Sequence, residues 1–236
     1  MGLFGSKRVG RKKAAESDAP SYLRPYQEAV AQHGPRFESL LWRNRDFQRT
    51  RFAVLVDAVD LTGRVVADMG CGNADLAEFL ATHHVPLKRY IGVEGVPALA
   101  ESSRSRIAAL GVAGDIVEAD FAAADLFTTL HAEHGVDVVM FSGSLNTFEQ
   151  ASALGVLDRA WSALACDNPA DGGALVFNFL STDGPKPPSN DPTDPARRFD
   201  PGQMLAWART KTPRVVFRQD YLDGHDAMIA LLPPTA

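Results

Sequence analysis

The stretch Val65-Val66-Ala67-Asp68-Met69-Gly70-Cys71-Gly72-Asn73-Ala74 decides the fold of this chain. A short apolar run rich in valine passes into a glycine-rich turn, and helical spacing begins at about Asp75. Glycine tolerates a positive φ and allows a ligand to approach the backbone, so Gly70 and Gly72 indicate a binding turn. In doubly wound sheets, ligands bind beyond the carboxyl end of such a strand. The stretch therefore predicts an α/β fold with a binding site after this strand.

Short apolar runs alternate with amphipathic segments on both sides of this stretch. Strands are expected at 64–69, 90–94, 115–118, 137–142, 174–180, 215–221 and 226–232, and helices at 75–84, 97–110, 149–166 and 201–210. Repeated β-α units favour a parallel sheet that carries helices on both faces. The turn signal Asp223-Gly224 before the last run indicates a hairpin. We predict a doubly wound, mostly parallel seven-stranded sheet with an antiparallel C-terminal strand.

The rest of the chain divides into further regions. Residues 1–20 are basic and lack apolar periodicity, which indicates a disordered tail. Met1–Ser6 fits an N-myristoylation pattern, although a chance match in a solvated tail is the simpler interpretation. Residues 21–60 have helical spacing and are expected to form an N-terminal helical extension or lid. The proline-rich segment 183–201 is predicted to be a functional lid or a mobile insertion.

Composition indicates a cytoplasmic globular protein. The chain has 236 residues, of which 45% are hydrophobic, and no transmembrane or secretory segment is recognisable. Its two cysteines, Cys71 and Cys166, have no disulfide or metal-ligand spacing, so no metal is expected. The net charge is −5. Because five basic residues lie in the first fifteen positions, the remainder of the chain carries a charge of −10. This acidic body disfavours nucleic acid as a partner. The sequence indicates no oligomeric state.

Three acidic residues bear on which cofactor such a turn could bind. Glu94 ends the next strand, where a carboxylate can accept both ribose hydroxyls. A dinucleotide motif would have its third glycine at position 75, but Asp75 would place a charge near a pyrophosphate. S-adenosylmethionine has no phosphate, and Asp68 suits its ammonium group. The pattern therefore favours S-adenosylmethionine over NAD.

Several motifs resemble those of class I, Rossmann-like S-adenosylmethionine-dependent methyltransferases. The stretch 68–74 resembles their first motif, with Ala74 where many members have a third glycine. Glu94 resembles their ribose-binding acid. Glu118-Ala119-Asp120-Phe121, Asp137–Ser142 and Gly172-Gly173 resemble later motifs in the same order. The resemblance covers roughly residues 36–232. It implies that residues 61–236, which follow the N-terminal extension, form the methyltransferase domain.

The resemblance also implies a set of cofactor contacts. Asp120 would bind the adenine amino group and Phe121 would flank the ring, although a helix cap and a core residue are the alternatives. Cofactor binding is expected at Asp68, Gly70, Cys71, Gly72, Glu94, Gly95, Asp120, Phe121 and Ser142. Gln48 or Arg51 is predicted to reach the methionine carboxylate, because arginine suits bidentate carboxylate binding.

The implied activity is methyl transfer to an acceptor by in-line displacement. Segment 141–148 lacks the Asn/Asp-Pro-Pro-aromatic motif of enzymes that methylate base amines or glutamine amides, which favours a small-molecule acceptor. A protein or macromolecule methyltransferase and a non-catalytic S-adenosylmethionine-binding protein are the alternatives. No catalytic residue is identified; Asn146, which could face the substrate, His225 and Tyr221 are weak candidates.

Overall fold

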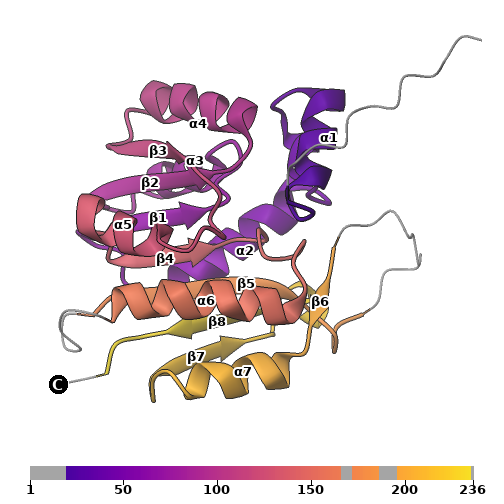
Figure 1. Cartoon of the computed structure of the whole chain (residues 1–236), viewed down its shortest axis with the longest axis vertical. Coiled ribbons are helices and arrows are strands. Elements are labelled where there is room, and N and C mark those ends of the chain that lie inside the picture. The colour runs from indigo at the N-terminus through magenta and orange to yellow at the C-terminus, as the bar shows by residue number, and fades with distance from the viewer. Residues whose placement is uncertain (1–19, 166–171, 186–195, 235–236) are drawn as a thin grey trace, which may run out of the picture.

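A central sheet organises the computed structural model, which describes residues 20–165, 172–185 and 196–234 (Figure 1). Its strand order is β3-β2-β1-β4-β5-β8-β7, with the short β6 paired to β5. The bounds are β1 Val65–Met69, β2 Arg89–Glu94, β3 Gly114–Glu118, β4 Val138–Phe141, β5 Ala174–Ser181, β6 Arg198–Phe199, β7 Val215–Arg218 and β8 Asp226–Leu231. Only β8 runs against its neighbours, β5 and β7. The predicted doubly wound sheet with an antiparallel C-terminal strand is confirmed.

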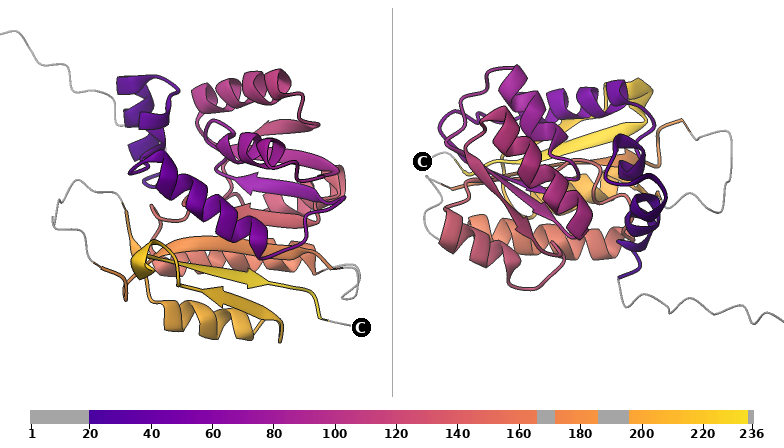
Figure 2. Two further views of the ribbon diagram at one scale, coloured as in Figure 1. Left: turned by 180° about the vertical axis from the view of Figure 1, so that it is seen from behind. Right: turned by 90° about the horizontal axis from the view of Figure 1, so that it is seen from above.

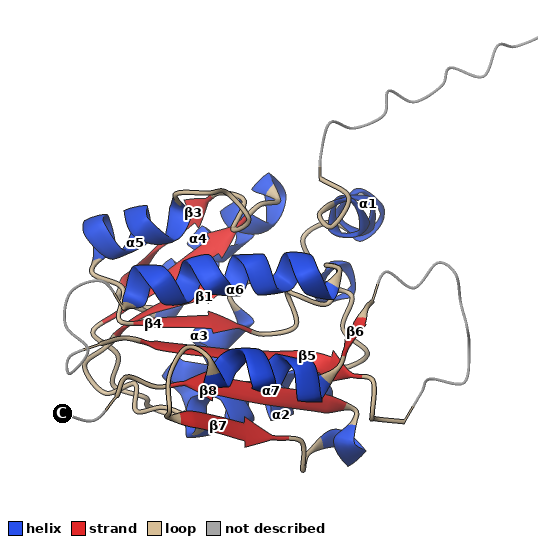
Figure 3. Ribbon diagram, turned by 60° about the horizontal axis from the view of Figure 1, so that its bottom comes forward, coloured by secondary structure: helices blue, strands red, loops and turns tan. Residues whose placement is uncertain are grey.

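Helices cover both faces of the sheet (Figure 3). One core packs α5 (Leu126–His134), α6 (Gln150–Leu164) and α7 (Pro201–Arg209) against the sheet. The other core packs α2 (Arg45–Asp57), α3 (Asp75–Thr82) and α4 (Pro97–Leu110) against the opposite face. Side chains alternate along β1, so that Val65 and Ala67 belong to the first core and Val66 belongs to the second. Burial on both faces explains the continuous apolar run of this strand.

Three details differ from the sequence-based expectation. Helix α5 was not predicted, because it is short and buries only Phe127 and Leu130. Strand β6 is a two-residue strand inside the segment expected to be an irregular loop. The connection from β7 to β8 is longer than a tight hairpin and contains the 3-10 turn η2 (Leu222–Gly224). β6 makes the sheet eight-stranded where seven strands are predicted, and its pairing with β5 lies outside the path of the other seven strands.

The N-terminal segment crosses the edge of the sheet where the parallel strands end (Figure 2). It contains α1 (Arg24–His33), the 3-10 turn η1 (Phe37–Leu40) and α2. Asn44 caps α2 by accepting a hydrogen bond from the Phe47 N–H at 2.8 Å. Phe52 and Leu55 of α2 belong to a sheet core, so this helix is part of the α/β body.

Several sequence-based expectations lie outside the described residues. They concern the basic tail with its myristoylation pattern, most of segment 183–201, and Cys166. Within the described ranges, no helix is both long and apolar enough to cross a membrane.

A buried ion pair joins α2 to β8. The Arg51 Nη2 donates to Asp226 Oδ1 at 2.7 Å, and the Arg51 Nε donates to Asp226 Oδ2. The two side chains are 6% and 0% exposed. Burial raises the pKa of Asp226, but hydrogen bonds from His225 and Arg51 outweigh it and hold the pKa below its ordinary value. Arg51 thus anchors the N-terminal segment to the far half of the sheet.

Replacing Arg51 with methionine should lower the free energy of unfolding by about 3–5 kcal/mol, because it leaves a buried carboxylate without its main partner. Arg218 forms an exposed pair with Asp220 at 2.9 Å, so Arg218→Met is the matched control and should cost less than about 1 kcal/mol. Urea denaturation of both variants measures the difference. Equal losses would show that the buried pair does not hold α2 in place.

Candidate functional site

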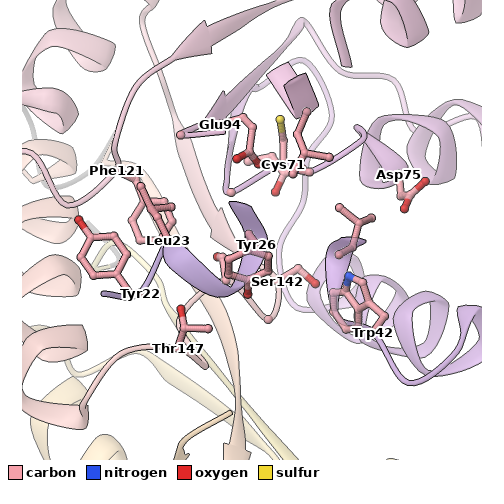
Figure 4. A pocket seen from close by; sticks show the side chains of 18 of the residues that line it. Tyr22, Leu23, Tyr26, Trp42, Cys71, Asp75, Glu94, Phe121, Ser142 and Thr147 are labelled. Atoms are coloured by element: carbon pink, nitrogen blue, oxygen red, sulfur yellow. Dashed lines mark hydrogen bonds between the residues drawn. The ribbon is translucent and has the colours of Figure 1, made fainter. Parts of the chain in front are cut away.

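A pocket lies at the carboxyl ends of β1, β2 and β4, beneath the N-terminal segment (Figure 4). It contains about 700 Å³ of empty space, including its mouth. Tyr22 and Phe121 lie at one end of the pocket, and Trp42 and Asp75 lie at the other. The turns after the strands form its floor, while α1, η1 and the start of α2 form its roof.

The turn after β1 is built from left-handed backbone. Gly70 has a φ of 73° and Gly72 has a φ of 57°. A Cβ on Gly70 would lie 2.7 Å from the Ser144 Cβ, and one on Gly72 would lie 2.7 Å from a methyl carbon of Leu40. Backbone conformation favours glycine at both positions, and at Gly70 the Ser144 Cβ also leaves no room for a side chain.

Glu94 links this turn to the loop after β2. Its Oε2 accepts the Gly72 N–H at 2.9 Å, and its Oε1 accepts the Val96 N–H at 2.8 Å. The residue is 6% exposed, and burial raises the pKa of its carboxyl to about 7 despite these hydrogen bonds. The carboxylate lines the pocket and retains lone pairs for hydroxyl donors.

Two further carboxylates line the pocket. Asp68 accepts the Tyr90 hydroxyl at 2.7 Å, and burial raises its pKa to about 7. Asp75 accepts the Gln48 Nε2 at 2.8 Å and the Arg106 Nη1 at 2.5 Å. Among the described lining residues there is no lysine, arginine or histidine. Asp68 and Glu94 therefore have no cation within the lining, and the pocket favours a positively charged ligand.

Aromatic rings form the other end. Phe121 lines the pocket and stacks on Phe148 with centroids 5.4 Å apart. Asp120 lies beside this end without belonging to the lining. Its Oδ1 accepts the Ala122 N–H at 2.8 Å, and its Oδ2 accepts the Tyr22 hydroxyl at 2.5 Å.

The loop after β4 contributes hydroxyl groups. Ser142 and Ser144 line the pocket, and each buried Oγ lacks a hydrogen-bond partner among the described residues. Between them, the Gly143 N–H donates to Asn178 Oδ1 at 2.8 Å. Trp42 covers Gly143 so closely that a Cβ there would lie 2.8 Å from the indole. Unsatisfied buried hydroxyls imply a polar ligand or water at this position.

The pocket brings together most of the residues predicted to bind a cofactor. They are Asp68, Gly70, Cys71, Gly72, Glu94, Gly95, Phe121 and Ser142. Gln48 also lines the pocket, whereas Arg51 is committed to Asp226. The Cys71 thiol lies 3.8 Å from the Ser103 Oγ, and burial raises its pKa well above the ordinary value, so it remains protonated.

The three weak catalytic candidates lie elsewhere, and none belongs to the lining. Asn146 Oδ1 accepts the Leu180 N–H at 3.3 Å. The ring of His225 contacts the Asp226 carboxylate at 2.7 Å. Tyr221 packs in the core beneath α2 and is 7% exposed. Asn146 and His225 thus have structural partners, and Tyr221 is a core residue.

Sequence reasoning missed the contribution of α1. Tyr22, Leu23 and Tyr26 line the pocket, and burial raises the pKa of Tyr26 to about 12, so its hydroxyl remains protonated. Leu40 of η1 also lines it. The available signal was the pair of tyrosines in an otherwise polar segment, but nothing in the spacing indicates where α1 docks.

Gly70→Ala should destabilise the protein by about 3 kcal/mol, because it combines left-handed strain with a steric clash. Gly63 has a φ of 68°, but a Cβ there would meet nothing within 4 Å. Gly63→Ala is therefore the matched control, and it should cost only the strain of about 1 kcal/mol. Thermal unfolding of both variants tests whether the turn at Gly70 is tightly packed. Equal losses of stability in the two variants would refute that packing.

Comparison with protein families gives a match over residues 66–167, to the family described as a methyltransferase domain. No curated protein sequence matches the chain significantly. The family match begins within β1 and ends just beyond α6, so it contains the turn, Glu94, Phe121 and Ser142.

Solved structures share the fold at low sequence identity. The mitomycin 7-O-methyltransferase MmcR is 17% identical with a TM-score of 0.62, and the match covers 92% of this chain and 62% of the MmcR chain. The S-adenosylmethionine-dependent methyltransferase SibL is 19% identical with a TM-score of 0.61, covering 89% and 62%. Phosphoethanolamine N-methyltransferase 1 of Haemonchus contortus is 14% identical with a TM-score of 0.62, covering 90% and 48%.

The chain thus spans 62% of the length of the first two of these proteins. The likeness to them shows a common fold, and the family match places the methyltransferase domain on the strands and turns that build the pocket. Residues 66–167 therefore match a methyltransferase domain, and the chain shares the fold of S-adenosylmethionine-dependent methyltransferases.

Proposed function

We propose that this protein transfers the methyl group of S-adenosylmethionine to a small-molecule acceptor by in-line displacement. The observation that carries the proposal is the lining of the pocket. Two buried carboxylates, Asp68 and Glu94, face it without a cation in the lining, beside a glycine turn and an aromatic end. This arrangement fits a ligand with a cationic amino acid part, a ribose and an aromatic base.

The residues of the chain have distinct tasks in this proposal. Asp68 receives the ammonium group, and Glu94 receives the ribose hydroxyls while it holds the turn. Phe121 flanks the adenine ring, and Asp120 accepts from its amino group. The bound cofactor supplies an already activated sulfonium methyl group. The roof of α1 and η1 excludes water and aligns the acceptor, which is the main contribution that such a reaction needs from the protein.

The acceptor end of the pocket is assigned to Trp42, Tyr26, Ser142 and Ser144. Its polar groups are the two serine hydroxyls that lack partners, and its apolar wall is the indole over Gly143. A concave, roofed pocket lined by apolar and aromatic side chains with a few polar groups is typical of small-molecule sites. Two of the similar structures are named as methyltransferases of small molecules. These features favour a small acceptor over a protein or another macromolecule.

Calorimetric titration tests the cofactor. Wild-type protein should bind S-adenosylmethionine and S-adenosylhomocysteine but not NAD. Glu94→Ala should weaken binding by about tenfold or more, since charged hydrogen bonds to the ribose and support for the turn are lost together. Glu101 is an exposed glutamate on α4, so Glu101→Ala is the matched control and should bind as the wild type does. Folded wild-type protein that binds neither sulfur ligand would refute the proposal.

Transfer itself requires a separate assay. Radiolabelled S-adenosylmethionine is incubated with the protein and with a host extract divided by ultrafiltration. Label is expected in the small-molecule fraction. Label confined to the macromolecular fraction would favour a protein or nucleic-acid acceptor, and binding without any transfer would favour a non-catalytic S-adenosylmethionine-binding protein.

Cofactor affinity should depend on pH. Because the ligand-free pKa values of Asp68 and Glu94 are about 7, binding a cationic ligand must first ionise these carboxyl groups. Affinity for S-adenosylhomocysteine should fall by up to about tenfold per pH unit and per carboxylate below pH 7, and level off above it. Protons should be released on binding, which titration in buffers of different ionisation enthalpy measures.

The same shifts have the opposite effect on the ligand-free fold. Raised pKa values mean that the folded state binds more protons than the unfolded state, so stability should decrease as pH rises from about 4 to 7.

Asp68→Asn provides the control for the pH dependence of cofactor affinity. An amide cannot ionise, so the affinity of this variant should depend less on pH. Affinity that is constant between about pH 5.5 and 8 would contradict this assignment.

A further inference from the structure

The turn that leads into α1 separates the pocket from an open groove. Three residues, Tyr22, Thr147 and Phe148, line both the pocket and a groove beside α6. The groove contains about 1280 Å³ of space, including the solvent at its open side. Tyr22 is thus part of a wall whose inner side faces the cofactor pocket and whose outer side faces solvent. Displacing this side chain would join the two spaces.

Tyr22 is held in this wall by two contacts. Its hydroxyl donates to Asp120 Oδ2 at 2.5 Å, and its ring stacks on Phe148 with centroids 4.1 Å apart. Burial and the Asp120 carboxylate raise the pKa of Tyr22 far above its ordinary value, so the hydroxyl stays a donor. The contacts join α1 to the loops that follow β3 and β4.

Resting on the proposed function, we propose that Tyr22 closes the adenosine end of the site over the bound nucleoside and must release Asp120 before the nucleoside can leave. Asp120 Oδ1 already accepts the Ala122 N–H. A carboxylate oxygen has two lone pairs, so Oδ2 can accept from Tyr22 and from an adenine amino group together. Tyr22 therefore stabilises the occupied pocket and does not compete with the nucleoside.

The packing of α1 is consistent with a movable cover. Leu40 of η1 packs with Val96 and Leu99 in a small cluster, and Tyr26 and Val30 of α1 lie against it. This cluster is separate from the two cores of the sheet. An element held by a small satellite cluster opens at a lower free energy than one embedded in the main core. Tyr22 itself packs against the first sheet core, so its contacts tie this end of the cover to the body of the fold.

Tyr22→Phe is the central test, because it keeps the stacked ring and removes only the hydroxyl. Stopped-flow displacement should show S-adenosylhomocysteine leaving about five- to tenfold faster, with an association rate changed less than twofold. Release of 5′-methylthioadenosine, which lacks the amino acid part, should accelerate by the same factor, since the contact lies at the adenosine end. Phe148→Leu, which removes the stacking partner, should accelerate release in the same direction.

Tyr221→Phe is the matched control. It removes a buried hydroxyl that has no partner among the described residues and lies outside the pocket, so release rates should not change. If Tyr22→Phe binds S-adenosylhomocysteine more tightly than the wild type does, Tyr22 competes with adenine and the proposal is overturned. Release of the ligand from Tyr22→Phe at the wild-type rate would also overturn it. Wild-type protein that binds neither nucleoside would instead overturn the proposed function, and the role of Tyr22 with it.

Discussion

The rest of the site depends on the carboxylate of Glu94. By accepting the N–H groups of Gly72 and Val96, it connects the turn after β1 to the loop after β2. Gly72 has a φ of 57°, and Leu40 of the roof packs so close to it that a Cβ there would lie 2.7 Å from a Leu40 methyl carbon. The turn that Glu94 holds is therefore also the place where floor and roof meet. The proposed role in ribose binding uses the remaining lone pairs of the same carboxylate, so structure and binding are not separable at this position.

The electrostatics of the pocket follow from that burial. Asp68 and Glu94 are desolvated, and of the three carboxylates in the described lining only Asp75 has an arginine partner, Arg106. Concentrating acidic groups is unfavourable in the ligand-free protein but favourable around a cationic sulfonium ligand. Because methyl transfer removes the sulfonium charge, the same field attracts the product less than the substrate. The acidic lining thus favours both cofactor capture and product exchange in the proposed reaction.

The sequence predicted local features better than distant contacts. Strands and the turn of Gly70 and Gly72 were predictable because periodicity and glycine spacing are local signals. Helix α5 was not predicted because it buries only two residues, which gives a weak periodic signal. Strand β6 was not predicted because it is only two residues long. The sequence shows that Arg51 lies in a helix and suits a carboxylate, but it does not show which carboxylate. Its partner, Asp226, lies 175 positions away. The Tyr22–Asp120 contact spans 98 positions. Such pairings are set by the docking of α1 and α2 on the sheet, which no local pattern encodes.

The N-terminal segment combines a fixed part with a less firmly held part. Helix α2 is anchored to β8 by the buried Arg51–Asp226 pair and contributes to a main core, whereas α1 and η1 rest on a satellite cluster. Leu41, between η1 and α2, has a φ of 57° and is 43% exposed, so the joint between the two parts carries backbone strain. The proposed release of Tyr22 concerns the part of the segment that precedes Leu41. Trp42 belongs to the anchored part, because its ring packs over the Arg51 guanidinium at 4.8 Å. The proposed adenosine end and the proposed acceptor wall are therefore held by different contacts.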